Sequence, residues 1–162
     1  MDDKIPVNLS KKDDPNYRYW MNKLKTKEIN NETEIVNLQN ISDILNYPEE
    51  ILLKFFSSEV GTSNISPNKL KGSFQEEKLQ ILLYRFIDEF KICSKCDTPE
   101  LTPYIETNKL NNRCSSCGTT IEIKKDNYKK SYNSIKNYLN NNSWPKSNGF
   151  LVENKDDDED DF

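Results

Sequence analysis

Histidine is absent from this chain of 162 residues, and glycine occurs only four times. The lack of histidine removes the most common general base and excludes Ser-His and Cys-His nucleophiles and any histidine metal ligand. With so few glycines, no Gly-x-Gly-x-x-Gly or Gly-x-x-x-x-Gly-Lys-Ser/Thr sequence exists, so nucleotide binding by those routes is excluded. No apolar stretch approaches the roughly 20 residues that cross a bilayer, and we expect a soluble protein with no membrane partner.

We expect no signal peptide. Met1–Lys12 is polar and charged, without an apolar core. We therefore expect a cytoplasmic protein in a reducing environment, where structural disulfides are rare. The composition, 34% hydrophobic and 31% charged, predicts one compact domain with a modest core and a small appendage.

The four cysteines form two Cys-x-x-Cys pairs, Cys93 with Cys96 and Cys114 with Cys117, separated by seventeen residues. Two such turns can close a tetrahedral Cys₄ site, and the spacing predicts a zinc ribbon. A Zn²⁺ ion enclosed by four thiolates has no open position for water, so we expect it to be structural and without catalytic activity.

Three other interpretations of the cysteines compete with zinc. Paired disulfides conflict with the reducing compartment. A redox Cys-x-x-Cys belongs on a thioredoxin-like scaffold, and no βαβ pattern surrounds these pairs. Iron in a rubredoxin-like Cys₄ site stays open, and metal analysis of the purified protein distinguishes it from zinc.

Charge is unevenly distributed along the chain. Glu153–Phe162 holds seven acidic residues and one lysine, so residues 1–152 carry 22 basic against 20 acidic side chains. Basic residues gather in and around the predicted ribbon and are candidates for contacts with a phosphate backbone. They are Lys91, Lys95, Lys109, Arg113, Lys124, Lys125, Lys129, Lys130 and Lys136.

Hydrophobic periodicity predicts four helices. A short one contains Ile41–Leu45, and a second begins at Pro48 and stops at Gly61. The longest has Ser73–Glu76 as a capping box and places Leu79, Leu82, Leu83, Phe86, Ile87 and Phe90 on one buried side. The last contains Tyr128, Tyr132, Ile135 and Leu139.

Short strands are predicted at 33–38, 69–74, 103–106 and 119–124. The segments divide the chain into a flexible lead-in at 1–14, an α/β domain at 15–91, a zinc ribbon at 92–125, a C-terminal helix at 126–142 and a disordered acidic tail at 143–162. Because an aromatic residue, Phe162, closes the acidic run, the tail is also a candidate docking peptide for a protein partner.

Arg18 lies between two aromatic residues, Tyr17 and Tyr19, near the N-terminus. A planar guanidinium group matches phosphate oxygens and does not titrate, so an arginine in this setting can act in trans on a nucleotide held by a partner. Most such arginines pack on their own domain, and the spacing alone does not decide between the two roles.

The order of several motifs resembles one known family. These are Asp14-Pro15-Asn16-Tyr17-Arg18-Tyr19-Trp20-Met21, Ile35-Val36-Asn37-Leu38, Lys54–Gly61, and Leu79–Phe90 leading into the Cys₄ ribbon. Residues 13–140 resemble the N-terminal domain of eukaryotic translation initiation factor 5, whose fold is shared with the β subunit of initiation factor 2. The resemblance implies an α+β fold: a small initiation-factor-1-like α/β domain, a zinc ribbon and a C-terminal helix.

The resemblance also implies a function. That domain binds the γ subunit of initiation factor 2 and promotes hydrolysis of its GTP on the small ribosomal subunit, with an arginine finger that corresponds to Arg18. Tyr17 and Tyr19 would then contribute to binding, and Lys95, Lys109, Arg113, Lys124 and Lys125 would lie near initiator tRNA and ribosomal RNA. On this resemblance we expect a short form that lacks the family's C-terminal helical-repeat domain.

The chain departs from the family pattern at Trp20 and Asn22, where lysine and proline are usual, and at Glu32, which stands near a usual lysine. Two other functions are therefore kept beside GTPase activation. One is a non-catalytic module that binds the ribosome or initiator tRNA and competes with or replaces a cellular factor. The other is a transcription-type zinc ribbon.

Overall fold

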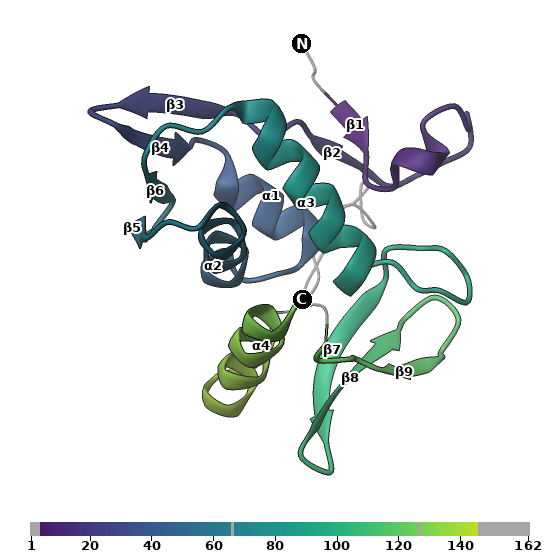
Figure 1. Ribbon diagram of the computed structural model, residues 1–162. Coiled ribbons are helices and arrows are strands. Elements are labelled where there is room, and N and C mark those ends of the chain that lie inside the picture. Colours follow the sequence, from purple (N-terminus) through teal and green to yellow (C-terminus); the bar gives the residue numbers. More distant parts are fainter. Residues whose placement is uncertain (1–3, 66, 127, 146–162) are drawn as a thin grey trace, which may run out of the picture.

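The computed structural model describes residues 4–65, 67–126 and 128–145. The structure combines three small antiparallel sheets with several helices, which confirms the predicted α+β class (Figure 1). The helices are η1 (Leu9–Lys11), α1 (Leu38–Leu45), α2 (Glu49–Val60), α3 (Glu76–Phe90) and α4 (Lys129–Asn141). The strands are β1 (Lys4–Pro6), β2 (Trp20–Asn22), β3 (Thr26–Ile29), β4 (Glu32–Ile35), β5 (Asn64–Ile65), β6 (Lys69–Lys71), β7 (Leu101–Glu106), β8 (Lys109–Cys114) and β9 (Thr120–Glu122).

The predicted flexible lead-in is wrong for the residues that the structure describes. Strand β1 pairs antiparallel with β2, and the Val7 backbone N–H donates to the Tyr19 carbonyl oxygen at 2.9 Å. The Tyr84 hydroxyl on α3 donates to the Pro6 carbonyl at 2.6 Å, and Val7 is fully buried. Residues 4–14 are thus part of an ordered arm, which we define as residues 4–22.

The α/β part is a four-stranded sheet in the order β3-β4-β6-β5 with helices α1, α2 and α3. The β3–β4 hairpin turns at Asn30 and Asn31, both with positive φ (53° and 61°), as a two-residue turn of this kind requires. Helix α2 begins after Pro48 and ends at Gly61, where a φ of 73° explains the glycine, as predicted.

Helix α3 supplies the predicted buried face, and the six apolar residues predicted for that face are at most 5% exposed. The predicted capping box at Ser73–Glu76 is wrong. The Ser73 hydroxyl instead donates to Glu28 on β3, and Glu76 accepts from the Thr26 backbone N–H, each at 2.8 Å. These tertiary bonds to the hairpin replace the local cap, and Gln75 precedes the helix without a side-chain cap.

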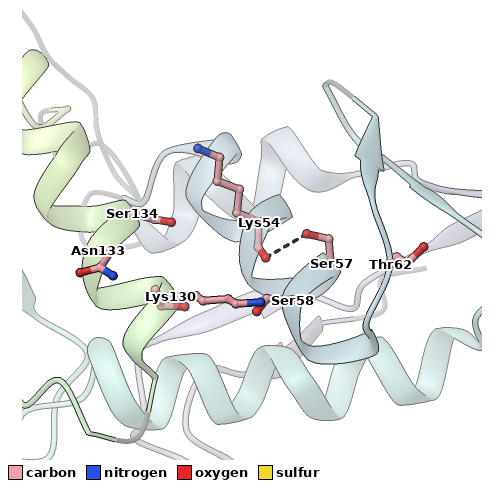
Figure 2. Close-up of a pocket in the computed structure, with 8 residues that line it drawn as sticks. Lys54, Ser57, Ser58, Thr62, Lys130, Asn133 and Ser134 are labelled. Carbon is pink, nitrogen blue, oxygen red and sulfur yellow. Dashed lines mark hydrogen bonds between the residues drawn. The ribbon is translucent and has the colours of Figure 1, made fainter.

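The ribbon is a three-stranded sheet in the order β7-β8-β9. Strand β8 was not predicted, because its sequence Lys-Leu-Asn-Asn-Arg-Cys is poor in β-branched residues. Its side chains nevertheless alternate, and Leu110, Asn112 and Cys114 are buried. Helix α4 packs beside α2, and a groove lies between these two helices (Figure 2).

Trp144 corrects the predicted start of the disordered tail. Its indole N–H donates to the Asn46 carbonyl at 3.0 Å, and its ring meets Tyr47 and Tyr138 edge-on at 4.9 and 5.6 Å. The chain after α4 therefore folds back onto the α/β core as far as this residue. The acidic run Asp156–Asp161 and Phe162 lie outside the described residues.

In the part of the chain that the structure describes, no helix has the length and apolar character needed to cross a membrane.

Candidate functional site

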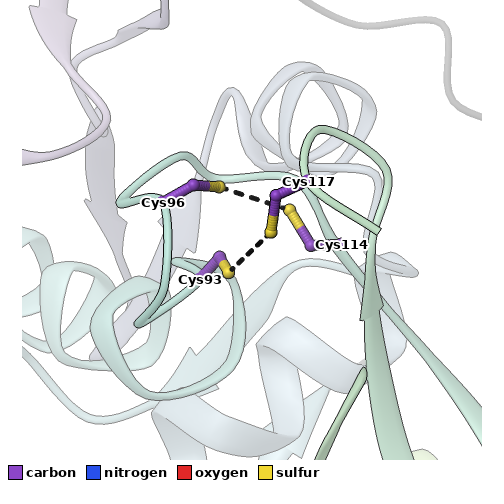
Figure 3. A group of neighbouring side chains, drawn as sticks. All are labelled: Cys93, Cys96, Cys114 and Cys117. Carbon is purple, nitrogen blue, oxygen red and sulfur yellow. Dashed lines mark hydrogen bonds between the residues drawn. The ribbon is translucent and has the colours of Figure 1, made fainter. Parts of the chain in front are cut away.

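The four cysteine sulfur atoms converge between two loops of the ribbon (Figure 3). All four lie within 4.8 Å of one another. The sulfur atoms of Cys93 and Cys117 are 3.8 Å apart, and those of Cys96 and Cys114 are 3.5 Å apart. A tetrahedral ion with metal–sulfur bonds of about 2.3 Å separates its ligands by about 3.8 Å. The four residues therefore fit a single metal ion.

Each Cys-x-x-Cys loop has the same backbone hydrogen bonds. In the first loop, the Cys93 N–H donates to the Thr98 carbonyl at 2.8 Å, and the Asp97 N–H donates to the Cys93 carbonyl at 2.8 Å. The residue after the second cysteine has positive φ in both loops, 63° at Asp97 and 79° at Gly118. In the second loop, the Cys114 N–H donates to the Thr119 carbonyl at 2.9 Å, and the Gly118 N–H donates to the Cys114 carbonyl at 2.8 Å.

Two threonines outside the predicted ligand set contact the sulfur atoms. The Thr98 hydroxyl lies 3.2 Å from the Cys96 sulfur, and the Thr119 hydroxyl lies 3.2 Å from the Cys117 sulfur. Hydrogen bonds led by that with Thr119 lower the pKa of Cys117 to about 6, whereas burial raises the pKa of Cys114 to about 11. The signal that could have revealed these threonines is the repeated sequence Cys-x-x-Cys-x-Thr.

The donor set limits the chemistry of a bound ion. Four thiolates suit zinc and also iron, and they leave no position for water or substrate. The cluster can therefore hold the two loops together, and catalysis has to come from residues elsewhere.

Lys91 connects α3 to the ribbon and contradicts its predicted role as a phosphate contact. It is only 4% exposed, its ammonium group donates to the Leu101 carbonyl at 3.0 Å, and it lies 5.8 Å from the centre of the Tyr47 ring. Burial lowers the pKa of Lys91 to about 8. Lys91 thus has a structural position at the junction, where no phosphate can reach it.

The arm carries Arg18 between two anchored neighbours. Tyr19 is 7% exposed and Tyr17 is half-buried, whereas Arg18 is exposed. The rings of Tyr17 and Tyr19 meet edge-on at 5.5 Å, and the Trp20 indole N–H donates to the Tyr17 carbonyl at 2.8 Å. The Arg18 guanidinium lies 5.9 Å from the centre of the Tyr19 ring. The aromatic residues hold the backbone on both sides of an exposed cation.

The arm is bonded to both cysteine loops. The Tyr19 hydroxyl donates to one oxygen of Glu100 at 2.9 Å, and the Ser115 hydroxyl donates to its other oxygen at 2.7 Å. On the first loop, the Lys11 ammonium forms an ion pair with Asp97 at 3.2 Å. Burial and then the Glu100 carboxylate raise the pKa of Tyr19. No local pattern points to Glu100, because its partners are distant along the chain.

Five of the other predicted basic residues lie in the ribbon segment, and Lys129, Lys130 and Lys136 lie on α4. Lys109 and Arg113 share a face of β8, and Lys109 forms a weak ion pair with Glu122 at 3.9 Å. The Lys125 ammonium lies 5.6 Å from the Tyr132 ring. All five are exposed: Lys95, Lys109, Arg113, Lys124 and Lys125.

Comparison with known proteins gives a consistent result. A family model for the domain found in initiation factors 2B and 5 matches residues 9–120, which include the arm from η1 onward, the α/β part and both cysteine loops. Eukaryotic translation initiation factor 5 of Caenorhabditis elegans is 31% identical over 119 residues, which are 68% of this chain and 27% of that protein.

Two further relatives carry the same name. The Dictyostelium discoideum protein is 35% identical over 65% of this chain and 29% of its own length, and the Saccharomyces cerevisiae protein is 34% identical over 65% and 28%. The chain thus spans less than a third of the length of these curated relatives.

Proposed function

The chain belongs to the family defined by the domain found in initiation factors 2B and 5, and from this premise we propose that it acts in translation initiation as a GTPase activator. In this proposal its target is the γ subunit of initiation factor 2, bound to GTP and initiator tRNA on the small ribosomal subunit, in the cytoplasm. Arg18 is the residue that acts on the nucleotide.

The observation that carries the proposal is the position of Arg18. Its neighbours Tyr17 and Tyr19 are packed and hydrogen-bonded, while the guanidinium group is exposed on the surface. The interaction of the guanidinium group with the Tyr19 ring leaves Arg18 exposed, so it remains accessible to a partner. An exposed cation on a fixed backbone can enter a partner's nucleotide site with little loss of conformational entropy.

The chemistry required of Arg18 is electrostatic. As water attacks the γ-phosphate and its bond to the β-phosphate oxygen breaks, negative charge accumulates on the transferring group and the leaving oxygen. A guanidinium group placed beside these oxygens stabilises that charge, and such arginines raise hydrolysis rates about 10³- to 10⁵-fold. The partner supplies the nucleotide, the Mg²⁺ and the attacking water.

Glu32, the charge reversal in the family pattern, does not lie beside Arg18. It is the first residue of β4 and stands opposite Lys71 of β6. Figure 1 shows the β3–β4 turn at the left end of the molecule, whereas β1 and β2 of the arm lie at the right. The arm and the hairpin also belong to different sheets. The substitution is therefore compatible with an Arg18 that contacts phosphate.

We also propose that the metal is zinc and that the exposed ribbon residues contact RNA. Zinc is favoured because it tolerates four thiolates in a redox-inactive structural site. Through Glu100 and Asp97, the metal-bound loops would position the arm and hence Arg18. The family match covers the α/β part as well as most of the ribbon, which favours initiation over a transcription-type ribbon.

The test is GTP hydrolysis in a reconstituted initiation complex. We expect Arg18→Ala to lower the stimulated rate by about 10³-fold or more. Arg85→Ala is the matched control, because Arg85 is also an exposed arginine but lies on α3. Equal rates for the wild type and Arg18→Ala would refute the catalytic proposal.

The same preparation tests the second function. Co-sedimentation with the small ribosomal subunit that survives Arg18→Ala, without stimulation of hydrolysis by the wild type, would favour the non-catalytic binding module. The exposed cations of the ribbon support this alternative, because they could contact RNA without any action on GTP.

A further inference from the structure

The groove between α2 and α4 lies outside the arm and the metal centre. It has a volume of about 380 Å³ and is lined by side chains from both helices, among them Lys54, Ser58, Lys130 and Ser134. Figure 2 shows Lys130 extending from α4 across the groove toward Ser58 on α2. Its volume falls in the range of about 300 to 1,000 Å³ that is typical of small-ligand sites.

We propose that this groove is a second nucleic-acid contact of the molecule and that it binds phosphate groups of a single-stranded RNA backbone. The inference is independent of the proposed GTPase activation, since it involves neither Arg18 nor a GTP-binding partner.

The lining favours an anion. Within the described part of the chain, the residues that line the groove are two lysines, five hydroxyl side chains and one asparagine, and none of them is a carboxylate. Among the described residues, neither Lys54 nor Lys130 has an ion-pair partner, and the hydroxyl groups of Ser58 and Ser134 make no hydrogen bond. Lysine ammonium groups bind phosphate as point charges, and serine hydroxyls donate to its oxygens.

Hydroxyl groups in the lining favour phosphate over a carboxylate ligand. A phosphate group offers more oxygens to donors on two facing helices than a carboxylate does, and both α2 and α4 supply hydroxyls. No aromatic side chain of residues 4–65, 67–126 or 128–145 lines the groove, so these residues offer no platform for stacking a base. The site is therefore suited to a sugar–phosphate backbone without selection of base identity.

Neighbouring charges favour a polymer over a free phosphate ion. Lys124 and Lys125 shortly precede α4, and Lys129 is its first residue, so further exposed cations adjoin Lys130 along the chain, interrupted by the single carboxylate of Asp126. A row of cations gains affinity from successive phosphates and releases counterions as each one binds.

The experiment measures binding of the full chain to a uridine oligonucleotide of about 12 nucleotides across a range of salt concentrations. In the double variant Lys54→Ala/Lys130→Ala, we expect affinity at low salt to fall about tenfold and the salt slope to decrease by about 1.4. The control pair Lys12→Ala/Lys27→Ala removes the same charge at exposed positions outside the groove, and we expect little change from it.

A second pair of variants separates the groove from general charge. Ser58→Ala/Ser134→Ala removes two hydroxyls without altering charge, and we expect affinity to fall about threefold with an unchanged salt slope. In a separate arm, inorganic phosphate alone should shift the backbone amide resonances of Ser58 and Ser134 at millimolar concentrations.

Two outcomes would overturn the proposal. One is equal RNA affinity for the groove pair and the control pair. The other is tighter binding of an aspartate peptide of matched charge than of the RNA, which would assign the groove to acidic protein segments. Both are measured without a GTPase, so neither depends on the outcome at Arg18.

Discussion

The α/β part and the ribbon are stabilised in different ways. In the α/β part, aromatic rings contact one another in the core. The centre of the Phe86 ring lies 4.9 Å from that of Tyr47 and 5.0 Å from that of Phe55. Around the four cysteines, the buried cluster consists of Cys93, Leu101 and Cys114, and Cys96 and Ile121 pack at its edge.

This contrast shows how a chain of modest hydrophobicity divides the task of folding. The α/β part belongs to one large apolar cluster, which also includes Leu110 and Ile123 of the ribbon, so we expect it to fold without a ligand. The cysteine loops have only a small buried cluster, so we expect metal ligation to supply most of their stability. The buried Lys91 links the two regions, and the hydrogen bonds of Glu100 link the arm to the ribbon. The predictions below test whether each region depends on its own source of stability.

The largest expected effect is that of removing the metal. For thiolate sites of this kind, binding contributes about 10 to 16 kcal/mol at neutral pH, so chelation should unfold the cysteine loops. We expect the amides of Cys114 and Gly118 to lose hydrogen-exchange protection while those of Leu83 and Ile87 on α3 keep it. Re-addition of Zn²⁺ should restore protection. Equal loss in both regions would contradict separate stabilisation.

Phe86→Ala tests whether the α/β part depends on its aromatic core. Because Phe86 is fully buried, its truncation should lower the free energy of unfolding by about 3 to 5 kcal/mol in urea denaturation of the metal-loaded protein. Ile81→Ala on the same helix is the control, since Ile81 is 55% exposed and should cost about 0.5 kcal/mol or less. A loss of bound metal in folded Phe86→Ala would show that the regions are not independent.

Trp144→Ala probes the segment after α4. Loss of its ring contacts and of its hydrogen bond to Asn46 should cost about 1 to 2 kcal/mol in thermal unfolding. Trp144→Phe should recover part of this loss, because it keeps one aromatic ring while removing the N–H donor and the second ring of the indole. A stability unchanged by either substitution would show that the contact contributes nothing in solution.

The smallest expected effect comes from Tyr19→Phe, which removes one bond between arm and ribbon. We expect a cost of about 1 kcal/mol, measured locally as faster hydrogen exchange at the Val7 amide, which donates to the Tyr19 carbonyl. Tyr104→Phe on β7 is the control and should leave Val7 protection unaltered. Identical exchange in both variants would argue against a role for the Glu100 link.

Local patterns are sufficient to predict much of the fold and the cysteine cluster. The spacing of the four cysteines predicts a cluster that the structure brings together within 4.8 Å. The periodicity of Leu79–Phe90 predicts the buried face of α3, and Pro48 and Gly61 mark the limits of α2. In each case the information lies within one turn or one helix.

Features that depend on distant partners could not be predicted. Lys4–Pro6 is a strand only because β2 pairs with it. Ser73 has the sequence context of a helix cap, but its hydroxyl donates to Glu28, which lies on a strand far away in the sequence. Lys91 falls among surface lysines in the sequence, although a carbonyl of β7 and the Tyr47 ring accommodate its buried ammonium group. Such positions need the tertiary fold before their environment is known.

The two tryptophans of the chain lie in different regions, and this gives the molecule two built-in optical reporters. Trp20 contacts Tyr17 in the arm, and Trp144 contacts Tyr47 where the chain returns to the α/β core. Single-tryptophan forms would therefore emit separate fluorescence signals from the arm and from the junction behind α4. Docking of the arm could then be followed in real time without an added dye.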